Sequence, residues 1–161
     1  MTYMIEFTAG SFWGWLYEEA VELAVNHAYG DRGLLHMPLI PIYGFGCLLL
    51  LLLYRRRNYS APFIFVSSAV ITTVLELVAS YPLQKFLGYL PWYYADWPLN
   101  YEGRISLVSS ILFGVLATVF MKLIHPQCRR LEKAPPAVVN TLGVIFLLAF
   151  LTDAAFTFAR I

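Results

Sequence analysis

The sequence predicts an all-α integral membrane protein, a bundle of about five transmembrane helices. Of its 161 residues, 60% are hydrophobic and 13% are charged, whereas soluble domains carry roughly 25% charged residues. The mean hydropathy is +0.66. The length fits a single domain over residues 1–161. A net charge of +1 and many large apolar side chains exclude a disordered chain and a nucleic-acid-binding module.

Five segments are candidate membrane spans, because a helix needs about 20 mainly apolar residues to cross about 30 Å of hydrocarbon. Three segments meet this requirement directly: residues 61–80, 106–124 and 137–158. We expect Pro126 to end the helix of residues 106–124, because proline stops a helix. Residues 37–54 are slightly short but end in an uninterrupted run of leucines. Residues 10–28 contain Glu18, Glu19 and Glu22, and a charge at mid-bilayer costs roughly 2.5–3.5 kcal/mol. We expect this segment to span inside the bundle, with a position at the interface as the alternative.

The start of the second segment contains Pro38, Pro41, Gly44 and Gly46 within nine residues. Proline lacks a backbone N–H and clashes with the preceding helical turn, and both residue types mark irregular backbone. We therefore expect a second span that is broken by proline and glycine, with unwound backbone facing a cavity or a substrate. A short external loop followed by a helix from about Ile42 is the alternative.

The basic residues orient the spans, because lysine and arginine favour cytoplasmic loops. Those that follow the second and fourth segments are Arg55, Arg56, Arg57, Lys122, Arg129, Arg130 and Lys133. We expect a cytoplasmic N-terminus and an external C-terminus, which leaves residues 81–105 as a long external loop. This loop is rich in tyrosine and tryptophan. It is typical of an interfacial aromatic belt or, alternatively, of a floor on which a sugar or head group stacks.

Polar residues recur at helical spacing within the apolar segments and predict polar faces that meet inside the bundle. The clearest series is Ser68, Thr72, Glu76 and Ser80. Ionisable residues at membrane depth point to a functional site, with a structural ion pair as the alternative. We expect a polar pocket open to the outer face, in which arginines keep carboxylates charged. Its predicted residues are Glu18, Glu22, Glu76 and Asp153, with Arg32 and Arg104 above them.

Several short motifs are spread along the chain. Glu18 follows an aromatic-Gly-aromatic run, Tyr43 lies in Pro-x-x-Pro-Ile-Tyr-Gly-Phe-Gly, and Asn100 opens Asn-x-x-Gly-Arg-Ile, the most specific of them. Over nearly its whole length the sequence resembles the CmpB-type ABC-transporter permeases, a bacterial membrane family. It departs at residues 92–97, Trp-Tyr-Tyr-Ala-Asp-Trp, where a Trp-Trp-Asp-Tyr-Ser run is expected. The resemblance implies a bacterial inner-membrane location and a pocket containing Glu18, Arg32, Tyr43, Glu76, Asn100, Arg104 and Asp153.

The first functional hypothesis is a transport or substrate-capture component whose acid and arginine pocket binds a small polar or anionic solute or a lipid head group. One alternative is an intramembrane enzyme acting on a lipid-linked or envelope substrate, with Glu18 or Glu76 as base and Arg104 as anion clamp. Another is an accessory structural subunit of a membrane complex. The sequence contains no recognisable catalytic, metal-binding or nucleotide-binding motif, so we predict no cofactor and no metal. Besides membrane lipid, the expected partner is a separate ATP-hydrolysing subunit or a second copy in a homodimer, and not nucleic acid.

Overall fold

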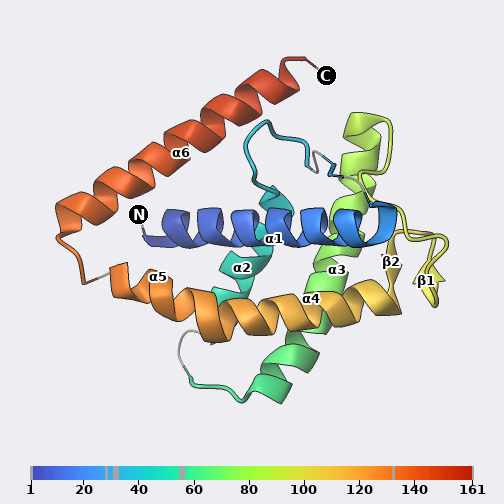
Figure 1. Ribbon diagram of the computed structural model, residues 1–161, viewed down its shortest axis with the longest axis horizontal. Coiled ribbons are helices and arrows are strands. Elements are labelled where there is room, and N and C mark those ends of the chain that lie inside the picture. Colours follow the sequence, from blue (N-terminus) through green and yellow to red (C-terminus); the bar gives the residue numbers. More distant parts are fainter. Residues whose placement is uncertain (1, 28, 31–32, 55–56, 132, 161) are drawn as a thin grey trace. The chain divides into compact units, whose positions relative to one another are not determined.

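The computed structural model confirms the predicted all-α class (Figure 1). Helices account for 74% of the structure, and the strands in its described part form one short hairpin. The described residues are 2–27, 29–30, 33–54, 57–131 and 133–160. The chain divides into two compact units. Unit 1 comprises Met1–Leu52 and Phe120–Ile161, and unit 2 comprises Leu53–Val119.

Unit 1 is organised around its N-terminal helix, which contacts helices from the C-terminal part of the chain. Its elements are α1 (Thr2–Asn26), α2 (Pro41–Tyr54, in this unit up to Leu52), the π-helix η1 (Phe120–Ile124), α5 (His125–Leu131) and α6 (Pro136–Phe158). The helix α1 packs on α6, α5 and η1. It also approaches α2 closely, because a Cβ atom on Gly10 would lie only 2.6 Å from the Sγ atom of Cys47. Small residues of this kind let membrane helices pack backbone to backbone.

The expected break inside the second span is wrong at Gly44 and Gly46, because α2 is a regular helix from Pro41 to Tyr54. Pro41 is the first helical residue, where the missing N–H costs no hydrogen bond. A Cβ atom on Gly44 would overlap the side chains of Ser11 and Phe7, so the glycine serves helix packing. Residues 33–40 before it are not helical, which matches the alternative of a loop followed by a helix.

Unit 2 consists of two packed helices joined through a loop and a hairpin (Figure 1). Its elements are α3 (Ala61–Leu87), β1 (Asn100–Tyr101), β2 (Ile105–Ser106) and α4 (Leu107–Val119). Thr73 donates a hydrogen bond to Ser110 across α3 and α4 at 2.7 Å. Ser68, Glu76 and Ser80 of the predicted polar face are buried. The exposed face of α3 carries Val66, Val70, Val74 and Val78, as expected for contact with lipid.

One helix extends beyond its predicted span, and one predicted helix end is wrong. The helix α3 continues through Pro82 and ends only at Gly88, whose φ of 78° gives the left-handed cap typical of glycine. The first residues of the expected external loop are therefore helical. Helical structure likewise continues past Pro126, because the π-helix η1 precedes α5 and the chain is helical over Leu107–Leu131. Pro126 therefore does not end the helix.

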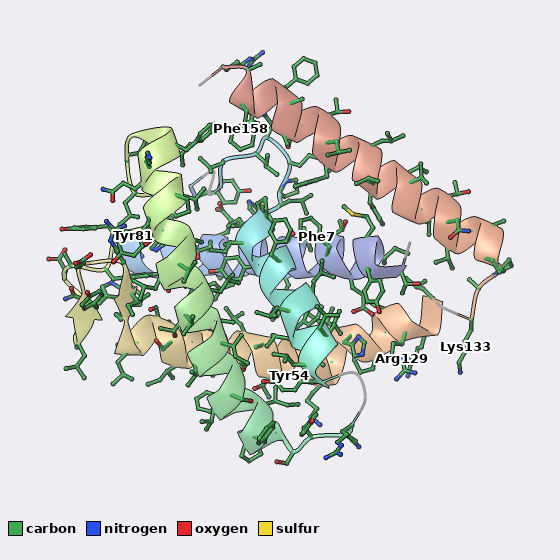
Figure 2. All side chains as sticks on the ribbon, turned by 180° about the vertical axis from the view of Figure 1, so that it is seen from behind. Phe7, Tyr54, Tyr81, Arg129, Lys133 and Phe158 are labelled. Carbon is green, nitrogen blue, oxygen red and sulfur yellow. The ribbon has the colours of Figure 1, made fainter. Side chains whose placement is uncertain are left out.

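Three helices in the described residues are long and apolar enough to cross a membrane: Ala61–Leu87, Leu107–Leu131 and Pro136–Phe158. The apolar helix α2 is shorter, and α1 carries four glutamates in its 25 residues. Spanning by these two helices stays a prediction. Side chains project from most of α6 (Figure 2), and only 11% of its most apolar window is buried. This surface suits contact with lipid.

Candidate functional site in the hairpin and on the helices

The hairpin of unit 2 turns sharply between Tyr101 and Arg104. The backbone N–H of Arg104 donates to the carbonyl of Tyr101 at 2.9 Å, and the two central residues, Glu102 and Gly103, have φ angles of 51° and 67°. Positive φ at both positions is the geometry of a type I′ turn, which favours Asn and Gly. A glutamate is strained at the first position. Its side chain lies beside Arg104.

Asn100 holds this hairpin to the loop that precedes it through its side-chain amide. Its Oδ1 atom accepts a hydrogen bond from the N–H of Gly103 at 3.1 Å. Its Nδ2 atom donates to the carbonyls of Ala95 and Trp97, both at 3.0 Å. The most specific motif of the sequence, Asn-x-x-Gly-Arg-Ile, therefore encodes a turn that presents Arg104, and Asn100 positions that turn.

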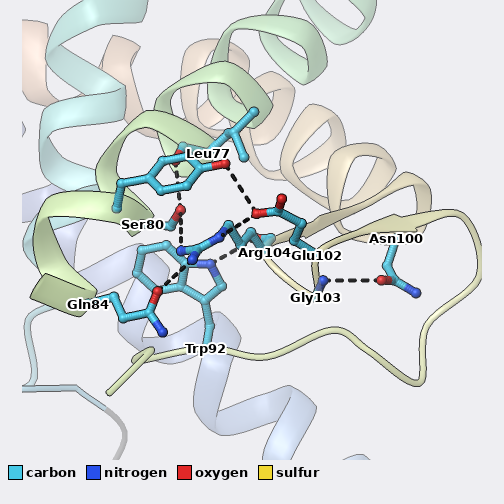
Figure 3. Close-up of polar contacts among 9 residues, drawn as sticks. Leu77, Ser80, Gln84, Trp92, Asn100, Glu102, Gly103 and Arg104 are labelled. Atoms are coloured by element: carbon cyan, nitrogen blue, oxygen red, sulfur yellow. Dashed lines mark hydrogen bonds and ion pairs between the residues drawn. The ribbon is translucent and has the colours of Figure 1, made fainter. Parts of the chain in front are cut away.

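The guanidinium of Arg104 lies against the last turns of α3 (Figure 3). Its Nη1 atom donates to Ser80 Oγ at 3.2 Å and its Nη2 atom to Gln84 Oε1 at 2.5 Å. Its Nε atom contacts Glu102 Oε2 at 3.1 Å, and its Cζ atom lies 4.2 Å from the centre of the Tyr81 ring. These five residues, Ser80, Tyr81, Gln84, Glu102 and Arg104, are called the Arg104 cluster below. The Arg104 side chain is only 13% exposed.

Two of the five guanidinium N–H groups have no acceptor among the described residues, since three hydrogen bonds use the other three. The backbone of Arg104 is also held in place, because the indole N–H of Trp92 donates a hydrogen bond to the Arg104 carbonyl at 2.9 Å. A rigid, partly buried guanidinium with free donors is suited to a carboxylate or phosphate group.

Glu76 lies one helical turn before Ser80 on α3 and is 5% exposed. Its Oε1 atom accepts a hydrogen bond from the hydroxyl of Tyr94 at 2.8 Å. Tyr94 is in turn tied to the hairpin, since its N–H donates to the carbonyl of Gly103 at 2.7 Å. Glu76, Asn100 and Arg104 thus all belong to unit 2. The acid that pairs with Arg104, however, is Glu102, which was not among the predicted site residues.

In unit 1, Asp153 of α6 holds the loop of residues 33–40. Its carboxylate accepts hydrogen bonds from the backbone N–H of Met37 at 2.8 Å and of His36 at 3.2 Å. The imidazole Nδ1 of His36 lies 3.0 Å from the same carboxylate and 3.2 Å from the hydroxyl of Thr157. Asp153 is 9% exposed and His36 is 59% exposed. A histidine and two backbone amides therefore bind Asp153.

Glu18 and Tyr43 meet between α1 and α2 of unit 1, where the tyrosine hydroxyl donates to the carboxylate. A Cβ atom on Gly14 would overlap the Tyr43 ring, so this glycine allows the ring to lie across α1. Glu22 lies one turn further along, and its Cγ atom would be 3.2 Å from a Cβ on Gly30. Arg32 lies outside the described residues. One common pocket for these residues and those of unit 2 stays a prediction.

A second acid–histidine pair in unit 1 was missed by the sequence analysis. Nδ1 of His125 in α5 lies 3.0 and 3.1 Å from the two carboxylate oxygens of Glu6 in α1. The Glu6 side chain is 4% exposed and that of His125 is 14% exposed. The only signal was a charged residue in the apolar start of α1. In the described part of the chain, no group of three or more His, Cys, Asp or Glu side chains is placed to hold a metal ion.

Comparison with known proteins identifies the family. The family model ABC_trans_CmpB, described as "Putative ABC-transporter type IV", matches residues 5–158. The chain belongs to this family. The resemblance expected from the motifs is therefore confirmed, and the chain is an ABC-transporter-related membrane protein. No curated protein and no solved structure matches it.

Proposed function

We propose that the chain is the membrane-embedded transport or substrate-capture component of an ABC-transporter system, and that it binds its ligand at the Arg104 cluster. The ligand class is a small polar or anionic solute or a lipid head group. The observation that carries this proposal is the Arg104 guanidinium, which is fixed by three hydrogen bonds while two N–H groups have no acceptor among the described residues.

The surroundings of Arg104 favour ligand capture over a purely structural ion pair. A structural pair is most stabilising when the charges satisfy each other fully. Glu102 contacts only the Nε side of the guanidinium, and its side chain is 52% exposed. The face of Tyr81 supports the guanidinium plane without using its N–H groups. The two remaining N–H groups of the guanidinium are therefore organised in advance for a planar or tetrahedral anion.

Unit 1 supports an orientation across the membrane. Its exposed basic residues Arg129, Arg130 and Lys133 lie just before the start of α6, whereas Asp153 and Thr157 lie near the other end of that helix. Figure 2 shows Lys133 and Phe158 at these two ends. Basic residues favour the cytoplasmic side. We propose a bacterial inner-membrane protein in which the N-terminus is cytoplasmic and the C-terminus is external.

The energy for transport would come from another chain. The sequence has no Gly-rich phosphate-binding loop followed by Lys and Ser or Thr, so it lacks the elements that bind ATP phosphates in P-loop proteins. The family description points to a transporter that uses ATP. A separate ATP-hydrolysing subunit, or a homodimer that recruits one, fits both observations.

Native mass spectrometry after purification in a mild detergent tests this proposal. We expect the wild-type protein to retain an ATP-hydrolysing subunit and a small ligand, and the R104Q variant to retain the subunit but lose the ligand. The matched control is R130Q, because Arg130 is an exposed arginine of unit 1 that contacts Gln127. Equal ligand retention by wild type, R104Q and R130Q would contradict the proposed site.

A further inference from the structure

We infer that the ligand of the Arg104 cluster is the zwitterionic head group of an amine-bearing phospholipid, such as a phosphoethanolamine group. Its phosphate would accept hydrogen bonds from the two spare N–H groups of Arg104, and its ammonium would bind the carboxylate of Glu102. This inference rests on the proposed capture function and names its substrate class.

The charges of the cluster match a zwitterion. Glu102 Oε2 accepts hydrogen bonds from Arg104 Nε at 3.1 Å and from the Tyr81 hydroxyl at 3.3 Å. Its Oε1 atom accepts none from the described residues, and the side chain is 52% exposed. A cation and an anion thus lie side by side, each with hydrogen-bonding capacity to spare. A simple anion would be repelled by Glu102, whereas a linked phosphate and ammonium satisfy both groups.

The length of α3 allows the cluster to lie in the head-group layer of a membrane. The helix has 27 residues, so it is about 40 Å long at roughly 1.5 Å per residue. The hydrocarbon core is only about 30 Å thick, which takes roughly 20 residues. If Ala61 lies at one boundary of the core, the opposite boundary falls near Ser80. Arg104 contacts Ser80, Tyr81 and Gln84, the residues that start the protruding end.

Exposed apolar side chains lie beside the polar residues of the cluster. Tyr93 is 70% exposed and Tyr101 is 53% exposed. Leu99 is 77% exposed and has a φ of 52°, which is a strained conformation for leucine. A water-soluble ligand would gain no binding free energy from these exposed apolar side chains. The glycerol and acyl groups of a lipid would cover them, and tyrosine is enriched at this depth of the membrane.

The test titrates the detergent-purified protein with three probes and measures binding by native mass spectrometry. The probes are phosphatidylethanolamine, the anionic lipid phosphatidylglycerol and water-soluble glycerophosphoethanolamine. We expect the wild type to prefer phosphatidylethanolamine to each of the other two. E102Q should lose about tenfold in affinity for phosphatidylethanolamine, the loss of one charge-assisted contact, while its affinity for phosphatidylglycerol should rise, because the repulsion by Glu102 is removed. R104Q should weaken binding of both lipids.

The matched control is D96N, because Asp96 is an exposed acid in the same loop outside the cluster. It should bind as the wild type does, and circular dichroism should show that all variants remain folded. Folded E102Q and R104Q proteins that bind phosphatidylethanolamine like the wild type would overturn the inference. A preference for phosphatidylglycerol would also overturn it. If the wild type binds glycerophosphoethanolamine and phosphatidylethanolamine with equal affinity, the lipid assignment is overturned but the proposed capture function stands.

Discussion

The Cζ atom of Arg104 lies 4.2 Å from the centre of the Tyr81 ring, so the guanidinium rests on an aromatic face at the end of α3. This contact holds the charge in place without consuming an N–H group. The guanidinium is therefore held by its contacts and keeps two N–H groups without an acceptor among the described residues. A ligand that binds there meets a site whose main cation loses little conformational entropy.

Replacing Arg104 by lysine separates charge from geometry. Lysine keeps the positive charge but lacks the planar fork that contacts Ser80 and Gln84 together. We expect R104K to weaken ligand binding by about tenfold or more, a loss of roughly 1.4 kcal/mol. Isothermal titration with the ligand identified by mass spectrometry measures this change. Unaltered affinity in R104K would mean that the charge alone recognises the ligand.

The close packing of the turn at Gly103 leads to a second prediction. A Cβ atom there would lie 2.5 Å from the ring of Tyr93, and its φ is 67°. Gly88 is the matched control, because it has a φ of 78° but no atom within 4 Å of its Cβ position. G88A should lower the free energy of unfolding only by the strain of the left-handed conformation, roughly 1–2 kcal/mol. G103A should lower the melting temperature more than G88A does and should also weaken ligand binding.

The carboxylate of Asp153 should be needed to hold the loop of residues 33–40. D153N replaces one acceptor oxygen by a donor that faces backbone N–H groups. We therefore expect the free energy of unfolding to fall by about 1–3 kcal/mol. Hydrogen exchange at the amides of His36 and Met37 should accelerate. T157V removes only one contact to the His36 ring and should leave these amides protected. Unchanged exchange in D153N would show that other contacts hold the loop.

The buried pair of Glu6 and His125 should behave as a coupled unit. Removing one partner of a buried pair leaves a polar group without compensation, which costs roughly 3–5 kcal/mol. We expect E6L and H125L each to lower the melting temperature strongly in detergent. The double variant E6L/H125L should be no less stable than either single variant. Additive losses in the double variant would mean that the two residues stabilise unit 1 independently.

Local patterns of the sequence were sufficient to predict much of the fold. Hydropathy identified the segments that became α3 and α6, and the four-residue spacing of Ser68, Glu76 and Ser80 identified a buried face. Rules for proline and glycine were less successful. Pro126 and Gly44 suggested a helix end and a break, but the π-helix before Pro126 and the packing of Gly44 on α1 overrode these preferences.

The site was harder to predict because its pairings join residues that are far apart in the sequence or depend on one unusual turn. Asp153 and His36 are separated by 117 positions, and no spacing rule connects them. Glu102 reaches Arg104 because of a strained turn that a glutamate rarely adopts. The sequence identified Arg104 and Glu76 as candidates, but their partners are Glu102 and Tyr94.

The most direct test of the central claim observes the Arg104 guanidinium itself. Nitrogen-15 NMR of arginine side chains in detergent micelles, with the Arg104 signals assigned by their loss in R104K, would follow them as an extract of the native membrane is added. We expect a saturable shift of these signals, because the spare N–H groups become hydrogen-bonded to a ligand. Arg104 signals that stay unchanged at every concentration of the extract would contradict this claim.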